Sequence, residues 1–141
     1  MGKILLEIVG TQRIDNQKDK TELTTVGSFD ILDEAYVIKY TEEQEPPLAP
    51  IDVTVVISRD EKSVEMTRTG PFSSRLMIEK SRRNLCSYGT EFGDILMGIA
   101  GHNIEAQISS NEGKFCFSYD IDINGALASK NEVTMTYKHQ E

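Results

Sequence analysis

The chain has 141 residues, of which 38% are hydrophobic and 27% charged, and its formal net charge is −8 at pH 7. This length and composition predict one globular domain, residues 1–141, rather than two cores or a disordered segment. An acidic chain lacks the basic surface that phosphate contacts need, so we expect no nucleic-acid partner. The first apolar run is too short for a signal peptide or a membrane span, which predicts a cytoplasmic protein without membrane attachment.

Apolar and polar residues alternate with a period of two through most of the chain, which predicts β-strands. In chain order, the alternating segments are 4–8, 23–31, 36–40, 51–57, 64–68, 115–123 and 133–137. Turn-forming residues at 59–62 and at Asn124-Gly125 predict two hairpins, and the proline-containing stretch 42–50 predicts a loop. Many short strands without a long helix favour an antiparallel barrel or sandwich.

One stretch, 91–100, also has its apolar residues at helical spacing. Gly93, Gly98 and Gly101 interrupt it, and each glycine weakens a helix by about 1 kcal/mol relative to alanine. Glycines inside a strand often mark bends at barrel corners, so we predict a bent strand here.

Three spaced motifs carry a resemblance to a known family. They are Arg68-Thr69-Gly70 followed by Ser74, then Tyr88-Gly89-Thr90-Glu91-Phe92-Gly93, then the strand and turn from Tyr119 to Gly125. In this order they resemble the bacterial YwiB-like family, a domain of unknown function, over nearly the whole chain. The resemblance implies an all-β antiparallel meander closed into a calycin-like barrel of about eight to ten strands, similar in architecture to lipocalins and fatty-acid-binding proteins. It implies no catalytic residue.

The motif Asp120-x-Asp122-x-Asn124-Gly125 looks like the start of an EF-hand calcium loop. The bidentate glutamate of such a loop would fall on Asn131, and Glu132 is one place too late. The preceding residues alternate as a strand rather than a helix, so we interpret the motif as a strand that ends in a turn.

Residues suited to metal binding or catalysis are scattered singly: Cys86, His102, Cys116 and His139. No zinc-ligand spacing, glycine-rich phosphate loop or serine nucleophile elbow occurs, so we expect no metal, no cofactor and no enzymatic activity. His102 stands in the turn-like triplet 101–103 without a carboxylate beside it in sequence, which we interpret as an exposed turn.

Arg68 is the residue that most directly suggests a function. Alternation places it on the same strand face as Val64 and Met66, which predicts that it points into the barrel. A buried guanidinium needs a partner, because an unpaired charge in an apolar interior costs several kcal/mol. Three kinds of partner are open: an acid such as Glu7 or Glu42 at the barrel end, a tyrosine hydroxyl, or the head group of an anionic ligand.

The resulting hypothesis is a non-enzymatic cytoplasmic barrel that binds a small, partly apolar, anionic ligand in its interior. The residues expected to line the site are Arg68, Tyr88, Tyr119, Phe29, Tyr36, Phe115 and Phe117. A barrel with a filled core that acts as a protein-interaction or regulatory module is the alternative. An enzyme with a cavity active site is the weakest hypothesis, because no paired catalytic groups stand out.

Overall fold

The structure is a computed structural model that describes residues 2–70, 73–109 and 111–140. Over these residues the chain forms ten strands, joined in sequence order by antiparallel pairing and closed by pairing of the first with the last. The strands are β1 (Gly2–Ile14), β2 (Gln17–Ile31), β3 (Ala35–Glu42), β4 (Ile51–Ser58), β5 (Ser63–Thr69), β6 (Ser74–Glu79), β7 (Arg83–Thr90), β8 (Gly93–Ile108), β9 (Glu112–Ile123) and β10 (Ala126–His139). The predicted all-β barrel is confirmed, and no helix long and apolar enough to span a bilayer occurs in this part of the chain.

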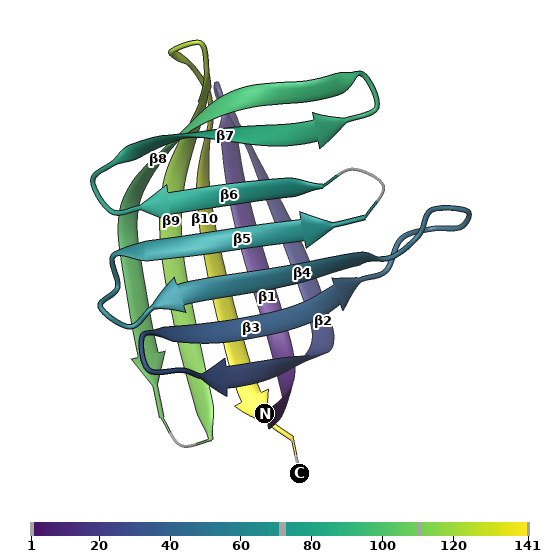
Figure 1. The fold of residues 1–141 in the computed structure, drawn as a ribbon, viewed down its shortest axis with the longest axis vertical. Helices are drawn as coiled ribbons and strands as arrows, with labels where there is room; N and C mark the ends of the chain where they lie inside the picture. Colours follow the sequence, from purple (N-terminus) through teal and green to yellow (C-terminus); the bar gives the residue numbers. More distant parts are fainter. Residues whose placement is uncertain (1, 71–72, 110, 141) are drawn as a thin grey trace.

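The barrel is flattened into two groups of strands that cross at a steep angle (Figure 1). Strands β3 to β7 run across the front, and β1, β2, β9 and β10 run behind them, with both termini at the lower end. The long strands β2 and β8 connect the two groups. β8 pairs with β7 over 93–100 and with β9 over 98–108, so the stretch with ambiguous spacing is the predicted bent strand.

Glycines stand at both corners where a long strand changes partner. At Gly27 on β2, a side chain would lie 2.5 Å from the carbonyl oxygen of Lys39. At Gly101 on β8, a side chain would overlap the backbone of Glu79, and the β8–β9 register shifts just beyond it. Only a residue without a Cβ allows the backbones to approach this closely.

Both predicted hairpin turns are present. Asn124 and Gly125 have φ angles of 55° and 85°, the pair of positive angles that a two-residue type I′ turn requires between β9 and β10. The second turn occupies 59–62 between β4 and β5, and Glu61 there has a φ of 61°.

Candidate functional site

Arg68 is the last residue but one of β5 and lies on the inner wall of the barrel, next to the first residues of β4 and β6. These strand ends are on the right in Figure 1. On the neighbouring strands it faces Val53 and Ser74. Tyr40 faces Val53 from β3, and Tyr88 faces Ser74 from β7. Residues that face each other across antiparallel strands project from the same side of the sheet, so these side chains form one row along this end of the barrel.

The guanidinium of Arg68 is held by the carboxylate of Glu42, the last residue of β3. Nη1 donates to Oε1 at 3.1 Å and Nη2 donates to Oε2 at 2.5 Å, a bidentate pairing. The two side chains are 32% and 25% exposed, so solvent reaches this pair. Of the partners that the sequence left open, the structure shows a carboxylate.

Two tyrosines lie within electrostatic range of Arg68, one on each side of the interior. Burial, with a contribution from Glu42, raises the pKa of Tyr40 to about 12, and the charge of Arg68 opposes this shift. Burial also raises the pKa of Tyr119 on β9, again against the effect of Arg68. Arg68 pairs in register with Val53 and Ser74, whose side chains are both buried, so it stands on the inner face of the sheet. Both phenols stay protonated at neutral pH, so both are possible hydrogen-bond donors.

Apolar side chains continue inward from Arg68. Met66 and Leu76 face each other on β5 and β6, and Met97 on β8 faces the buried Cys86 on β7. Met66, Leu76 and Met97 pack against the core but are only partly buried. Methionine adapts its shape readily to a neighbour. We call this region, with Tyr40, Glu42, Arg68, Tyr88 and Tyr119, the open end.

The opposite end of the interior is filled with aromatic rings and is called here the closed end. The ring of Phe29 stacks on that of Tyr137 at 4.5 Å between centroids, and Tyr36 lies 5.6 Å from Phe115. Phe115 and Tyr137 are almost completely buried. Three of the predicted lining residues, Phe29, Tyr36 and Phe115, therefore lie at the closed end, away from Arg68. Phe117 is buried further along β9, where it stacks on Tyr119 at 6.4 Å.

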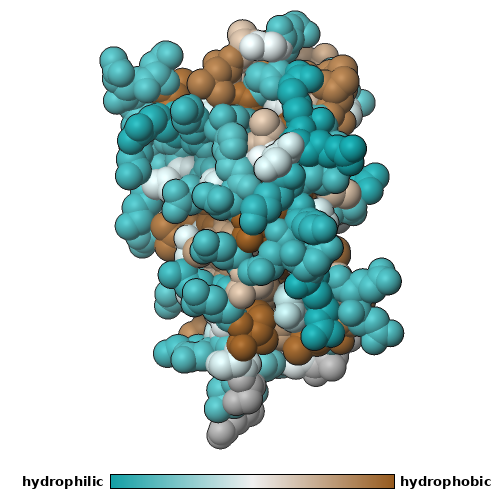
Figure 2. Space-filling view, turned by 90° about the vertical axis from the view of Figure 1, so that its left-hand side faces the viewer, coloured by the Kyte–Doolittle hydropathy of each residue, from teal (hydrophilic) through white to brown (hydrophobic). Residues whose placement is uncertain are grey.

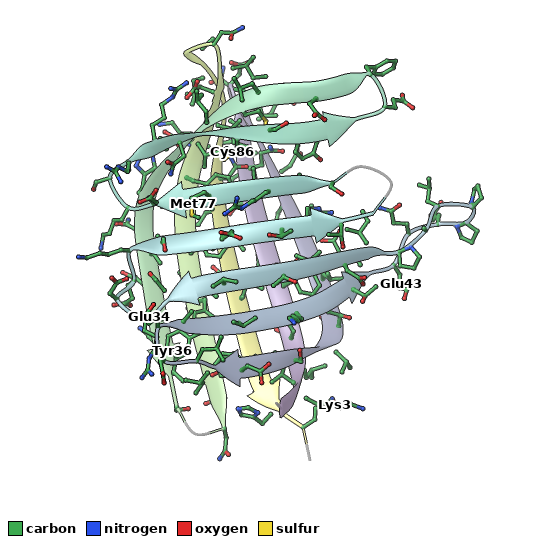
Figure 3. All side chains as sticks on the ribbon, viewed as in Figure 1. Lys3, Glu34, Tyr36, Glu43, Met77 and Cys86 are labelled. Atoms are coloured by element: carbon green, nitrogen blue, oxygen red, sulfur yellow. The ribbon has the colours of Figure 1, made fainter. Side chains whose placement is uncertain are left out.

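Beside the open end, strands β6 and β7 are connected by side-chain hydrogen bonds as well as by backbone pairing. Between β6 and β7, the one register pair among the described residues is Ser74 with Tyr88. The backbone N–H of Met77 donates instead to Cys86 Sγ at 3.4 Å, two residues that Figure 3 labels. The side chain of Asn84 donates to the carbonyl oxygen of Met77 at 3.4 Å. This join has fewer backbone hydrogen bonds than its neighbours.

His102 differs from its predicted setting in a turn. It lies within β8, at the irregularity where the register with β9 shifts, and its Nε2 is 3.0 Å from Oδ2 of Asp120 on β9. The histidine is half exposed on the outer face and borders a hollow of about 440 Å³, together with Arg13 and Lys130. The expectation of a turn was wrong because the irregular strand resembles a loop in sequence, and Asp120 is brought in by a neighbouring strand.

The EF-hand-like motif is explained by an ion pair and a turn on the outer face. Asp122 accepts hydrogen bonds from Arg83 at 2.7 and 2.8 Å and from the N–H of Gly125 at 3.1 Å, and Arg83 lowers the pKa of this carboxyl. The EF-hand-like segment is thus a strand that ends in a turn. No group of three or more His, Cys, Asp or Glu side chains suited to a metal ion occurs among the described residues.

Comparison with known proteins places the barrel in a family. Residues 6–135 match the domain of unknown function DUF1934. The chain belongs to this family. The uncharacterized β-barrel protein YwiB of Bacillus subtilis is 19% identical over 135 residues, which cover 96% of this chain and 92% of that protein. The crystal structure of the B. subtilis ywiB protein has a TM-score of 0.85 at 18% identity, covering 99% of this chain and 93% of that one.

These matches confirm the resemblance to the YwiB-like family and the barrel that it implied. Glu42, Arg68 and Tyr119 all lie within the matched DUF1934 range. Neither the family nor its B. subtilis relative has an assigned function, so function has to be argued from the chemistry of the site.

Proposed function

We propose that this DUF1934 protein is a non-enzymatic barrel that binds a small, partly apolar anion at the open end, with Arg68 holding the anionic head group. The observation that carries the proposal is the bidentate pairing of Arg68 with Glu42 at a position that solvent reaches. The guanidinium fork already holds a carboxylate in the geometry that a ligand carboxylate would adopt.

Glu42 is suited to giving way to such a ligand. It ends β3 and is followed by the connection 43–50, so its side chain stands at the boundary between sheet and loop. A ligand carboxylate on Arg68 would leave Glu42 free to turn into solvent. Tyr40 and Tyr119 remain protonated and can donate hydrogen bonds to the incoming head group.

The interior beyond Arg68 sets the size of the ligand. An alkyl or aromatic tail would lie against Met66, Leu76 and Met97, which are partly exposed and face inward. The tail would end before the closed end, because Phe115 and Tyr137 fill it. We therefore expect a short amphiphile to bind better than a long one, whose tail would stay in water.

Calorimetric titration with hexanoate, decanoate, hexadecanoate and decyl phosphate tests the proposal, with decanol as the neutral control. We expect the shorter anions to bind, decanol to bind at least about tenfold more weakly, and Arg68→Ala to lose at least about tenfold in affinity. Glu42→Gln should tighten binding, because it removes the competing charge on Arg68.

The matched control is Arg75→Ala. Arg75 pairs with Glu65 at 2.8 Å, but this pair lies on the outer face of β5 and β6. Its removal should leave binding unchanged. The proposal is wrong if neither the wild-type protein nor Glu42→Gln binds any of these anions, or if Arg68→Ala binds them as tightly as the wild-type protein does.

A further inference from the structure

Three exposed leucines lie on the outer face at one corner of the barrel. Leu85 on β7, Leu96 on β8 and Leu127 on β10 are 61%, 58% and 59% exposed. Leu85 and Leu127 belong to one row across the sheet, through Gly98 and Asp122, and Leu96 lies beside this row. Figure 2 shows hydrophobic side chains at this upper end of the molecule, with hydrophilic ones between them. We call the three residues the leucine patch.

The surface between these leucines contains a neutralised pair of charges. The guanidinium of Arg83 and the carboxylate of Asp122 form a bidentate pair that lies over Gly98, where any side chain would overlap it. No charged group therefore needs to lose its partner when the patch is covered. An apolar surface around a satisfied arginine is typical of the centre of a protein interface.

The patch offers a sheet face rather than a strand edge. The other flank of β7 is occupied by β6, because the N–H of Gly89 donates to the carbonyl oxygen of Ser73 and Met77 donates to Cys86. A partner cannot extend the sheet beside β7 and has to pack on its outer face.

The charges around the patch indicate which partner fits. The tip of the β7–β8 hairpin carries Glu91 and Asp94, and its base carries Lys80 together with Arg82, which pairs with Glu79 at 3.5 Å, so the base keeps a net positive charge. The six residues from Leu85 to the tip span about 20 Å. In two copies related by a two-fold axis through the patch, the acidic tip of each hairpin lies opposite the basic base of the other.

We propose that the leucine patch is a self-association interface, on which a second copy of this chain packs with its β7–β8 hairpin antiparallel to the first. This inference is independent of ligand binding at Arg68. It rests on the exposed leucines, the paired charges of Arg83 and Asp122 between them, and the opposite net charges at the two ends of the hairpin.

Analytical ultracentrifugation of the full chain at about 1 to 500 µM tests the interface. We expect a concentration-dependent dimer, and at least about tenfold weaker association in Leu96→Ser. Leu48→Ser is the matched control, because Leu48 is 60% exposed but lies in the 43–50 connection. Wild-type protein that stays monomeric throughout this range, or equal weakening by both variants, would overturn the proposal.

Charge reversal tests the antiparallel arrangement. A tip variant, Glu91→Lys with Asp94→Lys, and a base variant, Lys80→Glu with Arg82→Glu, should each fail to form homodimers because both ends then carry the same sign. Mixing the two variants should restore a heterodimer, since each tip again meets a base of opposite charge. Failure of the mixture to associate, with both variants melting like the wild-type protein, would contradict the arrangement. Binding of decanoate should be the same in Leu96→Ser and wild-type protein, which keeps this test separate from the proposed function.

Discussion

The two ends of the barrel interior are built by the same strands but differ in chemistry. Tyr36, at the start of β3, belongs to a cluster of stacked rings, while Glu42, at the end of β3, holds Arg68 in a partly hydrated ion pair. Figure 3 labels Tyr36 and Glu43 at opposite ends of this strand. Alternation of apolar and polar residues forms the strands, but the residue types at each end determine whether that end is packed with buried rings or contains an ion pair that solvent reaches.

The largest expected difference between the ends is in stability. Phe115→Ala removes a fully buried ring from the closed end and should lower the free energy of unfolding by about 3–5 kcal/mol. Met66→Ala at the open end should cost only about 1–2 kcal/mol, because Met66 is partly exposed and solvent can fill the space. Urea denaturation measures both, and equal losses would show that the open end is packed as tightly as the closed end.

Alkaline pH probes a tyrosine at each end. The pKa values of Tyr40 and Tyr137 are both raised to about 12, by burial in each case, with further contributions from Glu42 and Tyr36 respectively. Above about pH 10 the unfolded chain ionises these phenols while the folded chain keeps them neutral, so the unfolded state binds fewer protons and stability falls as the pH rises toward 12. Each group should contribute on the order of 2–3 kcal/mol to this loss.

Urea denaturation across this alkaline range separates the two groups. Tyr40→Phe and Tyr137→Phe should each remove part of the pH dependence. Arg68→Ala should shift the parts due to Tyr40 and Tyr119 but not the part due to Tyr137, because the charge of Arg68 opposes the raised pKa of the first two tyrosines and does not act on the third. An alkaline profile that stays unchanged in Arg68→Ala would contradict the placement of Arg68 near Tyr40.

Most of the fold could be predicted from the sequence, because alternation and turn residues are local signals. The turn at Asn124-Gly125 and the strand through 93–100 were found in this way, and the family resemblance supplied closure into a barrel. The division of the aromatic residues between two ends could not be predicted. Phe29 and Phe115 share the inner face with Tyr119, but alternation says nothing about position along the barrel axis.

The open end was only partly visible in the sequence. Tyr40 follows Tyr36 at even spacing on the inner face, and the same spacing reaches Glu42, which was one of the acids proposed as a partner of Arg68. Alternation gives this shared face, and the register of β3, β4 and β5 brings the residues together. The contact between His102 and Asp120 had no such signal, because it depends on the register of β8 and β9 after an irregularity. Register between distant strands is set by the whole barrel, not by local sequence.

A double-mutant cycle compares the open end with the outer surface. Arg68→Ala and Glu42→Ala should show a coupling of about 1–2 kcal/mol, since the pair is bidentate and partly buried. The same cycle on Arg75 and Glu65, in which the arginine is 66% exposed, should give less than about 0.5 kcal/mol. Both couplings come from urea denaturation, and similar values for the two pairs would show that Arg68 is as well hydrated as a surface arginine.

The smallest expected effect concerns a hydroxyl at the closed end. Tyr137 Oη is buried and has no hydrogen-bond partner among the described residues, and its ring lies against Gly113, where any side chain would overlap it. Removing a buried hydroxyl that makes no hydrogen bond relieves its desolvation cost, so Tyr137→Phe should change the free energy of unfolding by less than about 1 kcal/mol, in the stabilising direction. Tyr119→Phe at the open end should instead leave stability near its wild-type value and weaken binding of decanoate. A loss of more than about 1 kcal/mol in Tyr137→Phe would mean that the hydroxyl is hydrogen-bonded in solution, and that the closed end is less dry than its stacked rings indicate.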